Sequence, residues 1–283
     1  QGDLKKPRVD IAKADPSPKR GVSVREPQPD ERTVQVDPPQ KPVERTILDE
    51  QSIYAQRATQ DLQRQKVVKR YGGNPISEKS VQEGLAWLAR HQGGNGAWSQ
   101  SCMGRQAGSR CEDASYCKSV GGTYDMAHTG LAVLAFQGGG HFYFNGTKYS
   151  KNVRTGLQWI VEQQKPDGGL HTGASNHFMY EHGIATFALT EACALDKAAG
   201  RKSPPEWRAA AERAVRFIEV MQNNDGGWRY SRSTTERSDV SITGWQVLAL
   251  KTATEAEISY AEQVVEKARV FFQTCEIKGA GET

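Results

Sequence analysis

Residues 84–98 read GLAWLARHQGGNGAW, residues 156–170 read GLQWIVEQQKPDGGL, and residues 214–228 read AVRFIEVMQNNDGGW. Each stretch has a small residue first, then an aromatic–aliphatic pair, a glutamine, a glycine and a final tryptophan, all at the same spacing. The final position departs from this pattern only at Leu170, and a fourth copy begins at Ala268. A sequence repeat of this length indicates one supersecondary unit that is stacked several times.

A second kind of segment follows each copy and is apolar on every side. These segments are residues 130–135, 183–188 and 244–249, and each begins with glycine. A helix that is apolar all round must be buried on several sides, whereas the repeated phrase has the spacing of an amphipathic helix. The sequence therefore predicts an all-α fold made of outer and inner helix pairs.

Helix ends are also expected at particular residues. Glycines at 93, 94 and 96 should end a first outer helix over residues 77–92. The third outer helix should begin with Ser203 as N-cap and Pro204 as its first residue, with Glu206 completing a capping box.

The chain divides by composition into three parts. Residues 1–45 hold eight of the twelve prolines and no aromatic residue, which predicts a disordered, charged, Pro-rich linker. Residues 46–73 predict a basic helix, whose charges are usually a solvated face but can also meet an anionic partner or a membrane surface. Residues 74–283 carry the repeats and enough apolar residues for a core.

The net charge of +4 arises in the basic helix, so the sequence does not indicate a nucleic-acid binder. No apolar run reaches the roughly 18 residues of a membrane span. The chain begins with Gln1 and carries no apolar signal segment, which suggests the remainder of a longer protein. A flexible stalk before a folded domain favours an extracytoplasmic or envelope-tethered placement in a bacterium, with membrane contact only through an anchor outside these residues.

The repeated phrases resemble the QW motif of the squalene cyclase and protein prenyltransferase superfamily, whose fold is the α/α toroid. The third copy, preceded by Arg213, matches the motif at every position, and residues 238–245, SDVSITGW, resemble an inner-helix start of squalene–hopene cyclases. The leader and repeats together are similar to prenyltransferase and squalene oxidase repeat proteins of bacteria, planctomycetes in particular. The resemblance implies an incomplete toroid of about three and a half repeats, open or completed by a partner. It also implies a structural role for Gln92, Trp98, Gln164, Gln222 and Trp228.

The catalytic signatures of that superfamily are missing. Its cyclases donate a proton from a DxDD cluster, whereas Asp239 stands alone before its helix, where a cap is the more common role. Its zinc-dependent prenyltransferases need a cysteine two residues after an aspartate, and here Asp167 and Asp225 are followed by glycines. The sequence predicts no cofactor.

Polar and aromatic residues near the starts of the inner helices are the remaining candidates for a site. The resemblance implies that the fold opens its cavity there, so aromatic residues would form a rim and titratable residues would serve as acids or bases. The candidates are Tyr124, Tyr180 and Trp245 for the rim, and Asp125, His128, Glu181, His182 and Asp239 for weakly supported catalysis.

These titratable residues have a second interpretation. Glu181 and His182 can act as an acid–base pair or as metal ligands, or they can cap helices and line a wet cavity. His177 precedes His182 by five residues, which does not place both on one helix face.

A long turn in the first repeat carries three cysteines without a CxxC pair. Three alternatives remain: a disulfide in an oxidising compartment, a metal site completed by His91 or His128, or unpaired thiols. Two further cysteines lie on predicted helices and are expected in the core. The turn cysteines are Cys102, Cys111 and Cys117, and the helix cysteines are Cys193 and Cys275.

Two functions follow from these observations. Intact framework residues beside missing catalytic signatures favour a non-catalytic binding or scaffold domain, whose apolar concavity takes an apolar small molecule or a protein partner. The alternative is a squalene–hopene-like cyclase or prenyltransferase with a divergent active site, which fold analogy alone supports.

Overall fold

The computed structural model describes residues 69, 72–99, 124–172, 177–231 and 237–275. The chain divides into two units, residues 1–45 and 46–283, and every described residue lies in the second. These residues form helices and no strand, which confirms the all-α prediction. The helices are α3 (Pro75–Arg90), α4 (Asp125–Gly138), α5 (Ser150–Glu162), α6 (Phe178–Ala198), α7 (Pro205–Val220), α8 (Val240–Glu255) and α9 (Glu262–Thr274).

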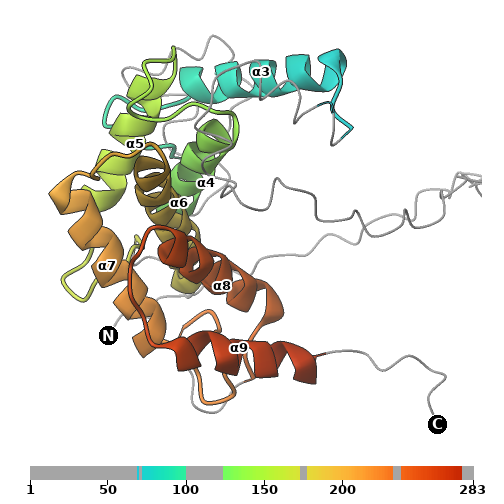
Figure 1. The fold of residues 1–283 in the computed structure, drawn as a ribbon, viewed down its shortest axis with the longest axis vertical. Coiled ribbons are helices and arrows are strands. Elements are labelled where there is room, and N and C mark those ends of the chain that lie inside the picture. The colour runs from blue at the N-terminus through green and yellow to red at the C-terminus, as the bar shows by residue number, and fades with distance from the viewer. Residues whose placement is uncertain (1–68, 70–71, 100–123, 173–176, 232–236, 276–283) are drawn as a thin grey trace, which may run out of the picture. The chain divides into compact units, whose positions relative to one another are not determined.

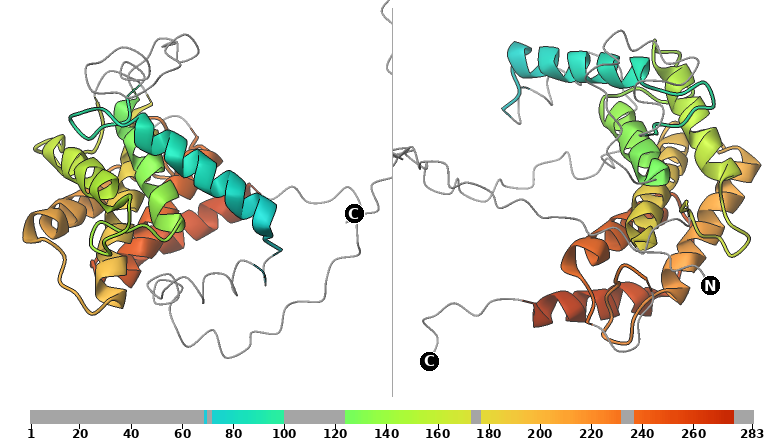
Figure 2. Two further views of the ribbon diagram at one scale, coloured as in Figure 1. Left: turned by 90° about the horizontal axis from the view of Figure 1, so that it is seen from above. Right: turned by 180° about the vertical axis from the view of Figure 1, so that it is seen from behind.

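Helices α4, α6 and α8 form an inner row with α6 in the middle (Figure 1). The contacts of α6 with α4 and with α8 are the most extensive between any two helices of the described residues. Helices α5 and α7 lie along one side of this row, as both views in Figure 2 show. The apolar helices are therefore the inner ones, and the helices that carry the repeated phrase cover them.

Glycines let the inner helices approach closely. A Cβ atom on Gly130 would lie 3.0 Å from Ile184 and 3.2 Å from the backbone of Ala185. A Cβ atom on Gly183 would lie 2.4 Å from the side-chain nitrogen of Gln246, which itself donates a hydrogen bond of 2.9 Å to the Met179 carbonyl. The third inner helix also carries a glycine at this position, Gly244, but nothing lies within 4 Å of its Cβ position.

The glutamine of each repeat joins two segments. Its side-chain nitrogen donates one hydrogen bond to the glycine carbonyl of its own turn and another to a carbonyl near the start of the next outer helix. Both acceptors are backbone carbonyls in all three repeats. The donor distances are 2.8 and 2.9 Å from Gln92 to Gly96 and Asn152, 3.1 and 2.9 Å from Gln164 to Gly168 and Ala210, and 2.8 Å each from Gln222 to Gly226 and Val264.

The turn glycines have a left-handed backbone and touch the next outer helix. Gly96, Gly168 and Gly226 have φ values of 93°, 94° and 89°. Added Cβ atoms would lie 2.4, 2.5 and 2.3 Å from backbone carbonyl oxygens of α5, α7 and α9, respectively. Each turn therefore requires glycine both for its φ angle and for the close contact.

The turns of the first and third repeats end in tryptophans that are buried in the core. Trp98 and Trp228 are almost fully buried. Each indole nitrogen donates a hydrogen bond of 2.8 Å to a carbonyl of its own outer helix, that of Leu88 or Ile218. The polar edge of each ring is therefore satisfied while its faces fill the core.

Two helix starts differ from the predictions. Helix α7 begins at Pro205 with Pro204 as N-cap and no side-chain cap, so the predicted capping box with Ser203 is wrong. A proline ring fixes φ for the first helical turn, so Pro205 starts this helix without a side-chain cap. Helix α3 begins at Pro75, two residues before the predicted start, because Asn74 and Ser77 form a capping box around it.

None of the helices that the structure describes is both long and apolar enough to cross a membrane.

Candidate functional site

The predicted site residues lie in or just before the first two turns of α4, α6 and α8. Tyr124 is the N-cap of α4 and makes no side-chain cap bond, and Asp125 is the first residue of that helix. Tyr180, Glu181 and His182 lie in the first turns of α6. The structure therefore places these candidates at corresponding ends of neighbouring inner helices.

Glu181 connects α6 to its surroundings although its side chain is 0% exposed. Its carboxyl group accepts hydrogen bonds from the hydroxyl of Thr172, at 3.0 and 3.1 Å, and from the backbone nitrogen of Thr172 at 3.3 Å. The backbone N–H of Met126, in the first turn of α4, is among the groups that lower the pKa of this carboxyl group. Glu181 therefore ties the start of α6 to the segment that precedes it.

Burial raises the pKa of Glu181, and the nearby carboxylate of Asp125 raises it further. The hydrogen bonds from Thr172 and Met126 act in the opposite direction and only reduce the shift. Asp125 itself has a buried Oδ1 atom without a hydrogen-bond partner among the described residues. One turn further along α4, the Nδ1 atom of His128 is also buried without a hydrogen-bond partner among the described residues.

His182 has the position that threonine has in the other repeats. In the first and third repeats, a threonine directly before the inner-helix glycine accepts the backbone N–H of the tryptophan that ends the turn. In the second repeat, Nδ1 of His182 accepts the N–H of Leu170. All three distances are 3.0 Å, for Trp98 to Thr129, Leu170 to His182, and Trp228 to Thr243.

The second nitrogen of His182 contacts the next outer helix. Its Nε2 lies 3.1 Å from the carbonyl oxygen of Ala214, so this nitrogen carries the proton and donates it to that carbonyl. The side chain is 0% exposed. Burial lowers the pKa of His182 to about 3, although the bond to Ala214 acts the other way. His182 is therefore neutral, and both nitrogens are used within the fold.

Asp239 is the N-cap of α8. Its Oδ1 accepts hydrogen bonds from the backbone nitrogens of Ser241 and Ile242, at 2.9 and 3.0 Å, and from the Ser241 hydroxyl at 2.6 Å. Partial burial raises its pKa, but the bonds from Ser241 and Ile242 outweigh this, and the pKa is lowered. A carboxylate that is held ionised in this way is a poor proton donor.

Of the aromatic candidates, Tyr180 lies on α6 and Trp245 on α8, whereas Tyr124 is the N-cap of α4. The hydroxyl of Tyr180 makes a short hydrogen bond with the hydroxyl of Ser241. The ring of Tyr230 lies 6.1 Å from Tyr180 and 4.5 Å from His177, measured between ring centroids. His177 therefore contacts Tyr230 edge to face.

The inner helices also leave apolar side chains in contact with solvent. Leu131 of α4 is 44% exposed, and Leu248 of α8 is 43% exposed. The ring centroids of Phe187, on α6, and Trp245, on α8, lie 6.5 Å apart, and both residues are partly buried. A separate cavity of about 630 Å³ beside the start of α8 is lined by more polar residues, including Arg237 and Asp239. The apolar side chains of the inner row are thus distinct from this polar cavity.

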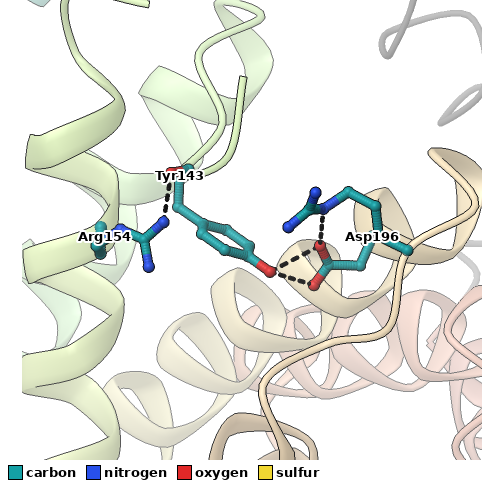
Figure 3. A network of polar contacts seen from close by, with 4 residues as sticks. Tyr143, Arg154 and Asp196 are labelled. Atoms are coloured by element: carbon teal, nitrogen blue, oxygen red, sulfur yellow. Dashed lines mark hydrogen bonds and ion pairs between the residues drawn. The ribbon is translucent and has the colours of Figure 1, made fainter. Parts of the chain in front are cut away.

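One buried polar network was not anticipated from the sequence (Figure 3). The hydroxyl of Tyr143 lies 2.7 and 2.8 Å from the two carboxylate oxygens of Asp196, which is 1% exposed. Arg201 pairs with the same carboxylate at 3.4 Å, and Arg154 donates to the Tyr143 carbonyl at 3.2 Å. Burial, followed by the bond to Asp196, raises the pKa of Tyr143. This network holds the segment between α4 and α5 against the end of α6.

One pattern in the sequence does mark His182 as a structural residue. Aligning the residue before each inner-helix glycine gives threonine, histidine and threonine, which shows that His182 has a framework position. No repeated pattern marks Tyr143, Asp196 or Thr172, because their contacts join segments that differ between the repeats.

The three turn cysteines, Cys102, Cys111 and Cys117, lie outside the described residues. Cys193 and Cys275 are free thiols, the first buried and the second partly exposed. Within the described part of the chain, no group of three histidine, cysteine, aspartate or glutamate side chains is arranged to hold a metal ion.

Comparison with known proteins gives two similarities. A family model for the squalene-hopene cyclase C-terminal domain matches residues 143–273, which include α5 to α8 and almost all of α9. A squalene–hopene cyclase of Bradyrhizobium diazoefficiens is 30% identical over 119 residues, which are 39% of this chain and 16% of that protein. The chain therefore spans only a small part of this relative's length. No solved structure matches.

Proposed function

We propose, from the premise that the repeat region of this chain belongs to the squalene cyclase and prenyltransferase repeat superfamily, that it is a binding or scaffold domain without catalytic activity. Its ligand surface would be the apolar side of the inner helices, where Leu131 and Leu248 are exposed. Its partner would be an apolar small molecule or an apolar segment of another protein.

The structural roles of Asp239 and His182, two of the catalytic candidates, support this proposal. Proton donation to an alkene needs a carboxylic acid that is protonated, strong and in contact with the substrate. Asp239 is instead a helix cap with a lowered pKa, and His182 is a buried neutral framework residue. Both side chains have their hydrogen bonds within the fold, so a structural role explains them without any reaction.

The ligand surface can be tested with matched variants. Leu131→Asp and Leu248→Asp place a charge on the inner helices, whereas Val220→Asp places the same charge on α7, where Val220 is 61% exposed. Mass spectrometry of apolar molecules that co-purify with each protein should show a large loss for the first two variants and none for the third. Equal retention by all variants would exclude this surface.

The absence of catalysis is tested separately. The purified protein is incubated with squalene and with an isoprenoid diphosphate, and products are sought by gas chromatography. Turnover of either substrate that disappears when the protein is denatured would overturn the non-catalytic proposal.

A second candidate is an isoprenoid enzyme with a divergent acid. Glu181 is the acid that this candidate would use, because a carboxyl group with a raised pKa stays protonated nearer to neutral pH, but its side chain is 0% exposed and a substrate could reach it only after local opening. If this candidate holds, Glu181→Gln and Asp125→Asn should each abolish turnover while Asp239→Asn mainly reduces stability. Unchanged turnover in both of the first two variants would exclude it.

A further inference from the structure

The helices that carry the repeated phrase share an apolar stripe on one face. The stripe consists of the small residue that begins the phrase, the residue three positions before it and the aromatic residue three positions after it. In α5 and α7 every residue of this stripe is buried, and in α9 Ala268 and Phe271 are each 1% exposed. The buried residues are Val153, Gly156 and Trp159 in α5, and Ala211, Ala214 and Phe217 in α7.

Helix α3 carries the same stripe but leaves it exposed. Val81 and Trp87 are each 40% exposed. Among the described residues, no atom lies within 4 Å of a Cβ atom placed on Gly84, whereas a Cβ atom on Gly156 would lie 2.9 Å from Val133 of α4. Helix α3 therefore has the sequence of a covered outer helix without a cover in the described part of the chain.

In the other repeats, the cover is the inner helix that comes directly before the outer helix in the chain. Helix α4 packs on α5, α6 on α7 and α8 on α9. The segments that connect each cover to its outer helix are residues 139–149, 199–204 and 256–261. Helix α4, which follows α3, meets a different face of α3, because a Cβ atom on Gly139 would lie 2.8 Å from Leu85. The order of the chain therefore indicates that the cover of α3 comes from the residues just before Pro75.

Residues 46–70 have the composition that such a cover requires. An apolar side chain recurs there at intervals of four residues, which places Tyr54, Ala58 and Leu62 on one face of the helix that the sequence predicts. Arg57 and most of the other basic residues of the segment lie away from this face. A unit at the end of a stack of repeats needs one face for the core and a polar face for the solvent. This segment supplies both.

We propose that residues 46–70 form a helix whose apolar face packs on the exposed stripe of α3, made of Val81, Gly84 and Trp87. The partner of this stripe is then a segment of the same chain. The structure describes only Lys69 of the segment, and Lys69 is helical and exposed. The basic side of the segment stays in solvent and gives the first repeat a charged outer surface. The cover does not use the ligand surface on the inner helices, so the two proposals stand or fall separately.

Photo-crosslinking identifies what lies on the stripe. In the full chain, p-benzoylphenylalanine replaces Trp87, and the linked peptides are identified by mass spectrometry after illumination. Crosslinks should reach residues 54–62, and a mixture of ¹⁵N-labelled and unlabelled protein should show that they form within single chains. The same crosslinker at Val220 of α7, which is 61% exposed, is the control and should not reach these residues. Crosslinks between copies, or none to residues 46–70, would overturn the proposal.

Proteolysis measures how firmly the segment is held. Trypsin cleaves after Arg57 only when the segment is released, so the cleavage rate follows the population of the open form. Leu62→Asp and Trp87→Ala should each raise this rate roughly tenfold or more, because each removes apolar area that the cover buries. Equal rates in the native protein and in both variants would contradict the proposal.

Two matched variants control for the substitutions themselves. Gln60→Asp places the same charge on the opposite side of the predicted helix, and Ile76→Ala removes a 78% exposed apolar side chain of α3 outside the stripe. Both should leave the cleavage rate unchanged, and an acceleration by Gln60→Asp as large as that by Leu62→Asp would also refute the cover. If circular dichroism shows that Trp87→Ala does not fold, Leu62→Asp and its control decide, because Leu62 lies outside the described helices.

Discussion

Leu170 and His182 depart together from the pattern of the other two repeats. Where the turn ends in tryptophan, a threonine accepts its backbone N–H, and where it ends in Leu170, the larger His182 does so. The ring of His182 also packs 4.6 Å from that of Phe217. A histidine in place of threonine therefore adds ring volume in the repeat that lacks the indole.

A double-mutant cycle tests this compensation. His182→Thr alone should lower the free energy of unfolding by about 1 to 3 kcal/mol, because it opens a cavity and leaves the Ala214 carbonyl without its donor. Adding Leu170→Trp should recover part of this loss, as measured by urea denaturation. Strictly additive effects would mean that the two residues do not compensate for each other.

The lowered pKa of His182 predicts that the free energy of unfolding depends on pH. Its folded pKa is about 3, because of burial, against about 6.5 in an unfolded chain. The neutral ring therefore contributes stability above about pH 6.5, and this contribution is lost as the pH falls toward 3. Unfolding free energies measured from pH 7 to pH 4 should fall more steeply for the native protein than for His182→Thr. Parallel curves would contradict the prediction.

At the scale of the elements, the turn between each outer helix and the next inner helix is the repeated joint. Its glutamine binds two carbonyls, and its glycine rests on the following outer helix. Because one of the two glutamine bonds and the glycine contact run to the next outer helix, each turn connects neighbouring repeats as well as its own pair of helices.

Alanine substitutions should destabilise the protein at the three turn glycines but not at a glycine inside a helix. Gly96→Ala, Gly168→Ala and Gly226→Ala should each destabilise the protein by at least about 2 kcal/mol, through an unfavourable φ angle and a clash with a backbone carbonyl. Gly84→Ala is the control: it lies within α3 with nothing near its Cβ position and should stabilise by about 0.5 to 1 kcal/mol. Thermal unfolding measures both, and similar effects for the two groups would refute the argument.

Sequence reasoning succeeded where a role repeats along the chain. The outer and inner helices followed from periodicity, and the all-α prediction is confirmed. It failed at the start of α7, where the serine pattern looked like a cap but the proline conformation decided the helix start. It also could not find Tyr143 with Asp196, which meet only after the repeats have stacked, or Thr172 with Glu181, whose contact follows from a turn without a repeated pattern.

At the scale of the whole repeat unit, the helices differ in how many neighbours hold them. Helix α6 packs against α4 and α8 in the row and also against α5 and α7. Helices α3 and α9 have far fewer contacts within the described residues. In stacked repeats, stability is roughly the sum of each unit and its nearest-neighbour interfaces.

Hydrogen exchange should therefore follow position in the stack. Amides of α6 should exchange slowest, and those of α3 and α9 should exchange fastest, with α4 and α8 between them. Peptide-level exchange by mass spectrometry measures this order. Uniform protection across all seven described helices would mean that the repeats unfold as one cooperative block.

Substitution of Gly244 can report how closely other helices pack against α8. Substituting alanine at Gly183 must push Gln246 aside, whereas the same methyl group at Gly244 meets open space. Gly244→Ala should then be harmless in the isolated protein. If it becomes harmful in a larger assembly, the difference would measure how tightly another helix presses on α8 there.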